Sequence, residues 1–210
     1  LFDRPTIQSL TRRLERVLHT VAADPDTRVG DIDVLEEAER HRLLVEFNDT
    51  QVPVDLDRGV HQVFQDQASA SPDAVALVFE DIEVSYADLD GRANRLAHHL
   101  LAQGVGSGDL VGVLLERGPD LVTALLAVLK TGAGYVPLDP DFPDERLTTM
   151  VRASGVGLVV SSSVLAKATD WSSTKFVLLD VDTEQERISA HPATAPGVVV
   201  GGEDVACVMF

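Results

Sequence analysis

A glycine-rich stretch, GVGSG from Gly104 to Gly108, is the first feature of the sequence that could do chemistry. Closely spaced glycines let backbone N–H groups approach a phosphate, and the dinucleotide-binding fingerprint G-x-G-x-x-G does so directly after a strand. Here the third glycine is misplaced for that fingerprint, and the stretch follows a predicted helix. We therefore interpret it as a helix cap followed by a loop.

An acidic cluster is the second candidate, because carboxylates can bind a divalent cation. Its members are Asp139, Asp141, Asp144 and Glu145. No histidine joins them, and they lie near a predicted helix start, where acids suit the helix dipole. We interpret them as helix-start residues, with a metal site as the alternative. The isolated histidines, which show no ligand spacing, are His19, His41, His61 and His191.

The composition excludes several classes of function. The chain has 210 residues with 34 acidic and 17 basic side chains, a formal net charge of −17. Such a surface repels phosphate backbones and anionic lipid, so we expect no nucleic-acid and no membrane partner. No apolar run reaches membrane-spanning length, and no signal-peptide pattern follows the first residue, which is leucine. We expect a cytoplasmic protein, and we interpret the chain as a piece of something longer.

Two single residues have ordinary interpretations. Cys207 is the only cysteine, so no internal disulfide can form, which fits a reducing compartment. We expect Cys207 to be a buried, small apolar residue in a strand, and Trp171 to pack under a surface loop.

The first part of the chain reads as a helical appendage. Asp3 to Ala23 has apolar residues at helical spacing on one face and arginines on the other. Val29 to Leu35 is expected to be extended, and Glu36 to Phe47 to be a second helix. A polar, proline-containing connector follows from Asn48 to Asp57. Because these apolar faces are single stripes, residues 1–50 are expected to contribute little to the main core.

The rest of the chain alternates strands with helices, which favours a three-layer α/β domain with a mostly parallel sheet and flanking helices. Residues 183–202 show no periodicity and are expected to form a mobile loop. The predicted helices are a short one around Val60 to Ala68, Tyr86 to Gly104, residues 120–131, Pro143 to Ser154 and a turn over Val164 to Thr169. The predicted strands are the hairpin Ala74 to Phe79 and Ile82 to Ser85, then Leu110 to Leu115, Tyr135 to Leu138, Leu158 to Ser161, Phe176 to Leu179 and Val205 to Phe210.

Two stretches carry a resemblance to a known family. Val84 to Leu100 reads VSYADLDGRANRLAHHL, and Leu129 to Pro140 reads LKTGAGYVPLDP. In order and at this spacing they resemble the first two core motifs of amino-acid adenylation domains in nonribosomal peptide synthetases, over roughly residues 50–210. On physical grounds the second stretch ends a helix, with Lys130 suited to the helix dipole and Gly132 to a left-handed cap.

The resemblance implies a function for the parent protein. An adenylation domain activates an amino acid with ATP and magnesium to an aminoacyl-adenylate, then loads it on the phosphopantetheine thiol of a carrier domain. Residues 1–50 resemble the tail of an upstream condensation domain with its linker, and residues 51–210 the first portion of the adenylation domain. His98 and His99 resemble a condensation-domain motif, but Gln103 stands where aspartate belongs. We interpret them as a solvated or half-buried helical pair.

The family's phosphate loop, ribose-binding aspartate and catalytic lysine match no position in this sequence. We therefore assign no catalytic, cofactor-binding or metal-binding residue within residues 1–210, and expect this stretch alone to be inactive. The phosphate loop is expected directly after a buried interior strand, Val205 to Phe210. Two alternatives remain: an acyl- or aryl-CoA ligase of the same superfamily, which the sequence upstream of Leu1 would distinguish, and a non-catalytic interaction fragment.

Overall fold

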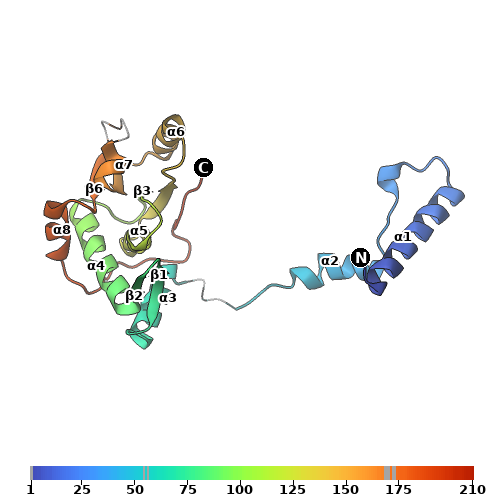
Figure 1. Ribbon diagram of the computed structural model, residues 1–210, viewed down its shortest axis with the longest axis horizontal. Coiled ribbons are helices and arrows are strands. Elements are labelled where there is room, and N and C mark those ends of the chain that lie inside the picture. Colours follow the sequence, from blue (N-terminus) through green and yellow to red (C-terminus); the bar gives the residue numbers. More distant parts are fainter. Residues whose placement is uncertain (1, 54, 56, 168–170, 172–173) are drawn as a thin grey trace. The chain divides into compact units, whose positions relative to one another are not determined.

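The computed structural model describes residues 2–53, 55, 57–167, 171 and 174–210. It divides into two compact units, Leu1–Val54 and Asp55–Phe210. Figure 1 shows their elements, and each unit is described by itself.

The first unit is built on the helix α1 (Arg4–Ala23), which begins where Asp3 accepts a hydrogen bond from the Thr6 backbone N–H at 2.9 Å. A 3₁₀ turn η1 (Val29–Asp31), the helix α2 (Glu37–Leu44) and a second turn η2 (Glu46–Asn48) follow. The expectation of an extended Val29 to Leu35 was wrong, because the chain turns here instead.

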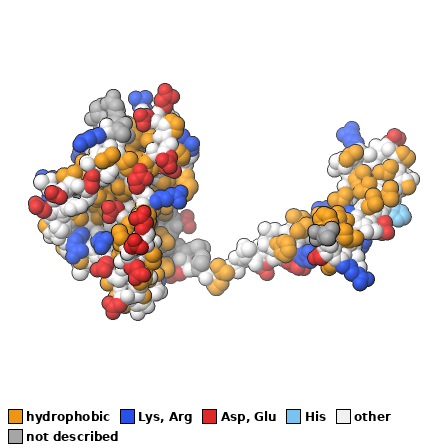
Figure 2. All heavy atoms as spheres, viewed as in Figure 1, with side chains coloured by type: hydrophobic (Ala, Val, Ile, Leu, Met, Phe, Trp, Pro, Cys, Tyr) orange, Lys and Arg blue, Asp and Glu red, His pale blue; other side chains and the backbone are white. Residues whose placement is uncertain are grey.

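No described residue of the first unit is buried. The apolar face of α1 stays open to solvent, with Leu14 and Leu18 each 59% exposed. Figure 2 shows hydrophobic side chains gathered on this unit. Two ion pairs connect α1 with α2 and the residue before it. Arg12 pairs with Glu36 at 2.9 Å, and Arg13 pairs with Glu39.

The second unit opens with the helix α3 (Val60–Ala70) and the antiparallel hairpin of β1 (Val75–Phe79) and β2 (Ile82–Ser85). The helix α4 (Tyr86–Ala102) begins at once, because the Ser85 hydroxyl oxygen accepts from the Asp88 backbone N–H at 3.1 Å. The predicted hairpin and helix start are confirmed.

A four-stranded parallel sheet forms the middle layer, in the order β4-β3-β5-β6. Its continuous apolar strands are typical of a sheet covered on both faces. Gly112 allows close packing at the centre: a Cβ added there would lie 2.8 Å from Val159 Cγ2. The strands are β3 (Leu110–Leu114), β4 (Gly134–Leu138), β5 (Leu158–Ser161) and β6 (Lys175–Leu178).

Two cores lie on opposite faces of the sheet. Val111 and Val113 pack with α4 and α5 (Pro119–Lys130), whereas Leu114 packs with α6 (Asp144–Ser154). The predicted three-layer α/β fold with flanking helices is therefore confirmed. Trp171 is buried in the α6 core, where its Nε1 donates to Thr148 Oγ1 at 3.1 Å.

Short helices complete the unit. The predicted turn over Val164 to Thr169 is the helix α7 (Ser163–Lys167), and Thr169 itself lies outside the described residues. The expectation of a mobile loop over residues 183–202 was wrong at its start, where α8 (Asp182–Ser189) forms.

The segment Val205 to Phe210 is not the interior strand that its apolar run predicted. It forms one isolated parallel bridge, between Cys207 and Tyr135 of the edge strand β4. Tyr135 N donates to Ala206 O at 2.9 Å, and Val208 N donates to Tyr135 O at 3.0 Å. Cys207 is half-buried instead of buried.

Candidate functional site

The two motif stretches meet through a buried ion pair. Lys130 Nζ, at the end of α5, lies 2.8 Å from Asp90 Oδ1 of α4. The Lys130 side chain is only 1% exposed, whereas Asp90 is 22% exposed. A buried ammonium needs a compensating partner, and Asp90 supplies it.

Asn94 extends this contact to a third segment. Its Nδ2 donates to Asp90 Oδ2 at 2.8 Å and to the backbone oxygen of Ala193 at 2.7 Å. Asn94 is itself buried. Asp90 and Asn94 of the first motif thus connect Lys130 of the second motif with the chain that follows α8. We call Asp90, Asn94 and Lys130 the motif junction.

The electrostatics of the motif junction follow from its burial. Burial lowers the pKa of Lys130, while the hydrogen bond from Lys130 to Asp90 opposes that change. His61 of α3 is also buried, and desolvation lowers its pKa, with a further contribution from the positive charge of Lys130. The junction holds three segments together.

The carboxyl edge of the parallel sheet is where ligands bind in open α/β folds. Near this edge, polar groups satisfy one another. Asp180 accepts from Ser163 N at 2.6 Å and from Ser163 Oγ at 2.7 Å, and the side-chain hydrogen bond is the main cause of its lowered pKa. Asp139 Oδ1 accepts from Asp141 N at 3.0 Å, so these two acids shape a turn.

The acidic cluster behaves as helix-start residues. Asp144 and Glu145 occupy the first turn of α6. In the described part of the chain, no group of three His, Cys, Asp or Glu side chains is placed to hold a metal ion.

The glycine-rich stretch is a helix cap and loop, as predicted. Gly104 and Gly108 have positive φ angles of 91° and 85°. The loop is fixed by Asp109 Oδ2, which accepts from the Gly106 backbone N–H at 2.8 Å.

The histidine pair on α4 is less exposed than expected. His98 is half-buried, but His99 is buried and its Nε2 lies 2.7 Å from Glu184 Oε1 of α8. The interpretation as a solvated or half-buried pair was therefore wrong for His99. The ring of His191 lies against both, with centroids 6.3 Å from His98 and 5.6 Å from His99.

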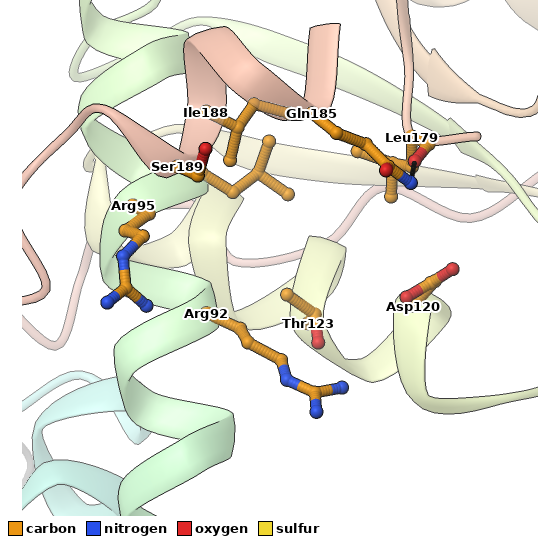
Figure 3. A pocket seen from close by; sticks show the side chains of 9 residues that line it. Arg92, Arg95, Asp120, Thr123, Leu179, Gln185, Ile188 and Ser189 are labelled. Atoms are coloured by element: carbon orange, nitrogen blue, oxygen red, sulfur yellow. Dashed lines mark hydrogen bonds between the residues drawn. The ribbon is translucent and has the colours of Figure 1, made fainter. Parts of the chain in front are cut away.

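A cavity of about 340 Å³ opens between α4, α5 and α8. In Figure 3, Arg92 and Arg95 extend from α4, Asp120 and Thr123 from α5, and Ile188 and Ser189 from α8. Sequence analysis missed this cavity, because α8 was not predicted.

Comparison with known proteins identifies the family. The family model of the AMP-binding enzymes matches residues 64–210, which include both motif stretches and the whole parallel sheet. The chain belongs to the AMP-binding enzyme family. Asp90, Asn94 and Lys130 all lie inside the matched range.

Curated relatives are similar over the whole chain. A linear gramicidin synthase of Brevibacillus parabrevis is 38% identical over 209 residues, which is 100% of this chain and 3% of that protein. Chondramide synthase cmdD of Chondromyces crocatus is 37% identical over 213 residues, 100% of this chain and 5% of that protein. The chain thus spans only a few per cent of the length of these relatives.

Solved structures agree with this assignment. The nonribosomal peptide synthetase FmoA3, in its AMPPNP-bound form, matches with a TM-score of 0.71 and 28% identity. The match covers 99% of this chain and 22% of that one. The resemblance of this chain to the first part of a synthetase adenylation domain is therefore confirmed.

Proposed function

We propose that this chain is the first part of an adenylation domain that activates an amino acid for a nonribosomal peptide synthetase. The observation that carries the proposal is the pair of family motifs, in order, within residues 64–210 that match the AMP-binding enzymes. The identity to gramicidin and chondramide synthases over the full chain supports a peptide synthetase over an acyl- or aryl-CoA ligase.

In the proposed reaction, a carboxylate oxygen of the amino acid attacks the α-phosphorus of ATP and pyrophosphate leaves. The thiol of a carrier domain's phosphopantetheine then attacks the acyl carbon, and AMP leaves. Magnesium in the parent domain would stabilise the phosphate charge. The similarity to a synthetase solved with AMPPNP supports the use of ATP.

The role proposed for this stretch is structural. The motif junction fixes α4, α5 and the chain after α8, and the parallel sheet supplies the carboxyl edge beside which a nucleotide would bind. We assign no catalytic, cofactor-binding or metal-binding residue to it.

The domain organisation is also a proposal. Residues 1–50 are proposed to be the tail of an upstream condensation domain with its linker, and residues 51–210 to begin the adenylation domain. The proposed partners in the same polypeptide are a condensation domain before the adenylation domain and a carrier domain after it. The proposed location is the cytoplasm. In the described residues, no helix is both long and apolar enough to cross a membrane.

Amino-acid-dependent ATP–pyrophosphate exchange tests the function. We expect the longer protein that contains this chain to exchange pyrophosphate with one or a few amino acids, and residues 1–210 alone to show none. Exchange that requires a fatty or aryl acid, followed by transfer to CoA, would identify the ligase alternative. No exchange by the longer protein with any acid would identify a non-catalytic fragment.

A further inference from the structure

A second, smaller cavity lies where the start of α3 meets the turn between α5 and β4. Its lining includes residues 58–61, the turn residues Gly132 and Ala133, and residues 204–206. The volume is about 120 Å³, well below the roughly 300–1,000 Å³ of pockets that hold drug-sized ligands. The cavity therefore suits a small ion or molecule, and it is too small for a nucleotide.

His61 lines this cavity as a buried polar side chain without a partner. It is only 3% exposed, and neither ring nitrogen forms a hydrogen bond with any residue that the structure describes. The ring lies over the first residue of the helix start, because a Cβ added at Gly59 would lie 2.7 Å from His61 Cε1 and 3.0 Å from its Nδ1. A buried polar group without a partner is costly, so the His61 ring is placed to contact a hydrogen-bonding ligand.

The start of α3 adds backbone donors at the same place. The first N–H groups of a helix have no acceptor within the helix. Here Gly59 N donates to Gln62 Oε1 at 2.9 Å and Gln62 N donates to Gly59 O at 3.0 Å, whereas Val60 N and His61 N donate to no acceptor in the described part of the chain. Because α3 has 11 residues, its dipole also places partial positive charge at this end.

The charges around His61 favour an anion. Burial lowers the pKa of His61, and the positive charge of Lys130 lowers it further, although Lys130 is paired with Asp90. No carboxylate of the described chain offsets these two effects on the His61 pKa. The lining itself contains one cation, Arg58, and one anion, Asp204, so its own formal charges balance. The helix end and the ammonium of Lys130 therefore decide the sign of the potential at the ring, and it is positive.

We propose that this cavity binds a small free oxyanion, of the class of inorganic sulfate and phosphate, between the His61 ring and the first N–H groups of α3. The volume restricts the ligand to the free ion, because an organic substituent on the phosphate would exceed the cavity. The proposal does not rest on the proposed adenylation function, and its test needs neither ATP nor an amino acid.

Titration of the 210-residue chain with sodium sulfate, followed by NMR, tests the site. Sulfate should shift the backbone N–H signals of Val60 and His61 to saturation, and inorganic phosphate should do the same. Sodium chloride at equal ionic strength and phenyl phosphate are the matched probes. Each should bind at least about tenfold more weakly, since chloride offers no set of acceptor oxygens and phenyl phosphate is too large. Equal binding of chloride or of phenyl phosphate would overturn the proposal.

Variants locate the binding and test its sign. His61→Phe keeps a ring and removes both nitrogens, so sulfate should bind about tenfold more weakly. His41→Phe is the control, because it changes an exposed histidine of α2 and should leave binding unchanged. Asp204→Asn removes a carboxylate of the lining but keeps an oxygen for the Gly201 N–H, which donates to Asp204 Oδ2 at 2.8 Å, so sulfate should bind about threefold more tightly. Unchanged binding in His61→Phe, or weaker binding in Asp204→Asn, would refute the site.

Discussion

The ion pair between Lys130 and Asp90 is asymmetric, and its two ends should respond differently to mutation. Asp90→Ala leaves a buried ammonium without its partner, so we expect a loss of about 3–5 kcal/mol in the free energy of unfolding. Lys130→Met leaves an acid that is partly exposed and still accepts from Asn94, so about 1–3 kcal/mol is expected.

Denaturant unfolding of both variants measures the difference. Asp66→Ala is the control, because the pair of Asp66 with Arg58 is exposed and should contribute less than about 1 kcal/mol. Equal losses for Asp90→Ala and Asp66→Ala would show that the buried pair does not stabilise the fold.

The sequence indicated Lys130 only as a cation suited to a helix C-terminus. A signal for its burial was present, since the lysine ends a helix that is apolar nearly all round. Its partner could not be found this way, because Asp90 lies 40 residues earlier and only tertiary packing brings the two together. The burial of His99 was also missed, because it depends on packing against α8, a helix that the sequence did not predict.

At the level of elements, the centre of the sheet depends on Gly112 of β3. A Cβ there would come within 2.8 Å of Val159 Cγ2 and 3.1 Å of Leu138 Cδ1. Gly112→Ala should therefore destabilise the protein by about 1–3 kcal/mol through overpacking.

Thermal and denaturant unfolding check this expectation. Gly157→Ala is the matched control, because a Cβ at that exposed glycine meets no atom within 4 Å. It should change stability by less than about 1 kcal/mol. A Gly112→Ala variant as stable as Gly157→Ala would contradict the close packing of β3 against β5.

The contact between α4 and α8 should make stability depend on pH. Desolvation lowers the pKa of His99, although Glu184 opposes this, and His191 and Arg187 lower it further. The unfolded chain, with a histidine pKa near about 6.5, then takes up the proton at higher pH than the folded protein. Neutral His99 therefore stabilises the fold at pH values above the pKa of the unfolded state. This contribution is lost as the pH falls through the pKa of His99 in the folded protein.

Unfolding free energies measured between about pH 7.5 and 5.5 test this dependence. We expect the loss of stability toward acid to be smaller in His99→Gln than in the unaltered chain. His19→Gln, which changes an exposed histidine of α1, should leave the slope unchanged. A slope that is the same in all three proteins would remove His99 from the explanation.

Element prediction succeeded where periodicity was strong and failed where it was weak. The strands β3 to β5 and the helices α4 to α6 follow from apolar patterns and cap residues. In contrast, α8 is short and polar, and Ile188 is its one residue packed on the core. For Val205 to Phe210 the error was the reverse, because a strand was predicted that did not form. An apolar run indicates extended backbone, but it does not determine how many of its residues pair with a neighbouring strand.

At the scale of the whole molecule, the two units differ in how they are stabilised. The first unit has ion pairs and helix caps but no buried described residue, whereas the second has two cores. Hydrophobic burial dominates folding stability, so the second unit should hold most of it. Deleting residues 1–54 should lower the melting temperature by no more than about 4 °C, equivalent to less than about 1 kcal/mol.

Calorimetry of residues 1–210 and 55–210 provides the comparison. A peptide of residues 1–54 should show no cooperative transition by itself, since its apolar faces are single exposed stripes. A large drop in melting temperature on deletion, or a cooperative transition in the peptide, would contradict this division of stability.

The motif junction also restricts how related AMP-binding domains can be recombined. A chimera whose crossover falls between residues 91 and 129 inherits the acid at position 90 from one parent and the amine at position 130 from the other. Where the two parent proteins differ at either position, the hybrid contains a buried charge without its partner, which neither parent contains. Crossovers placed before Asp90 or after Lys130 transfer both partners together, and libraries built at those points should yield the larger share of soluble hybrids.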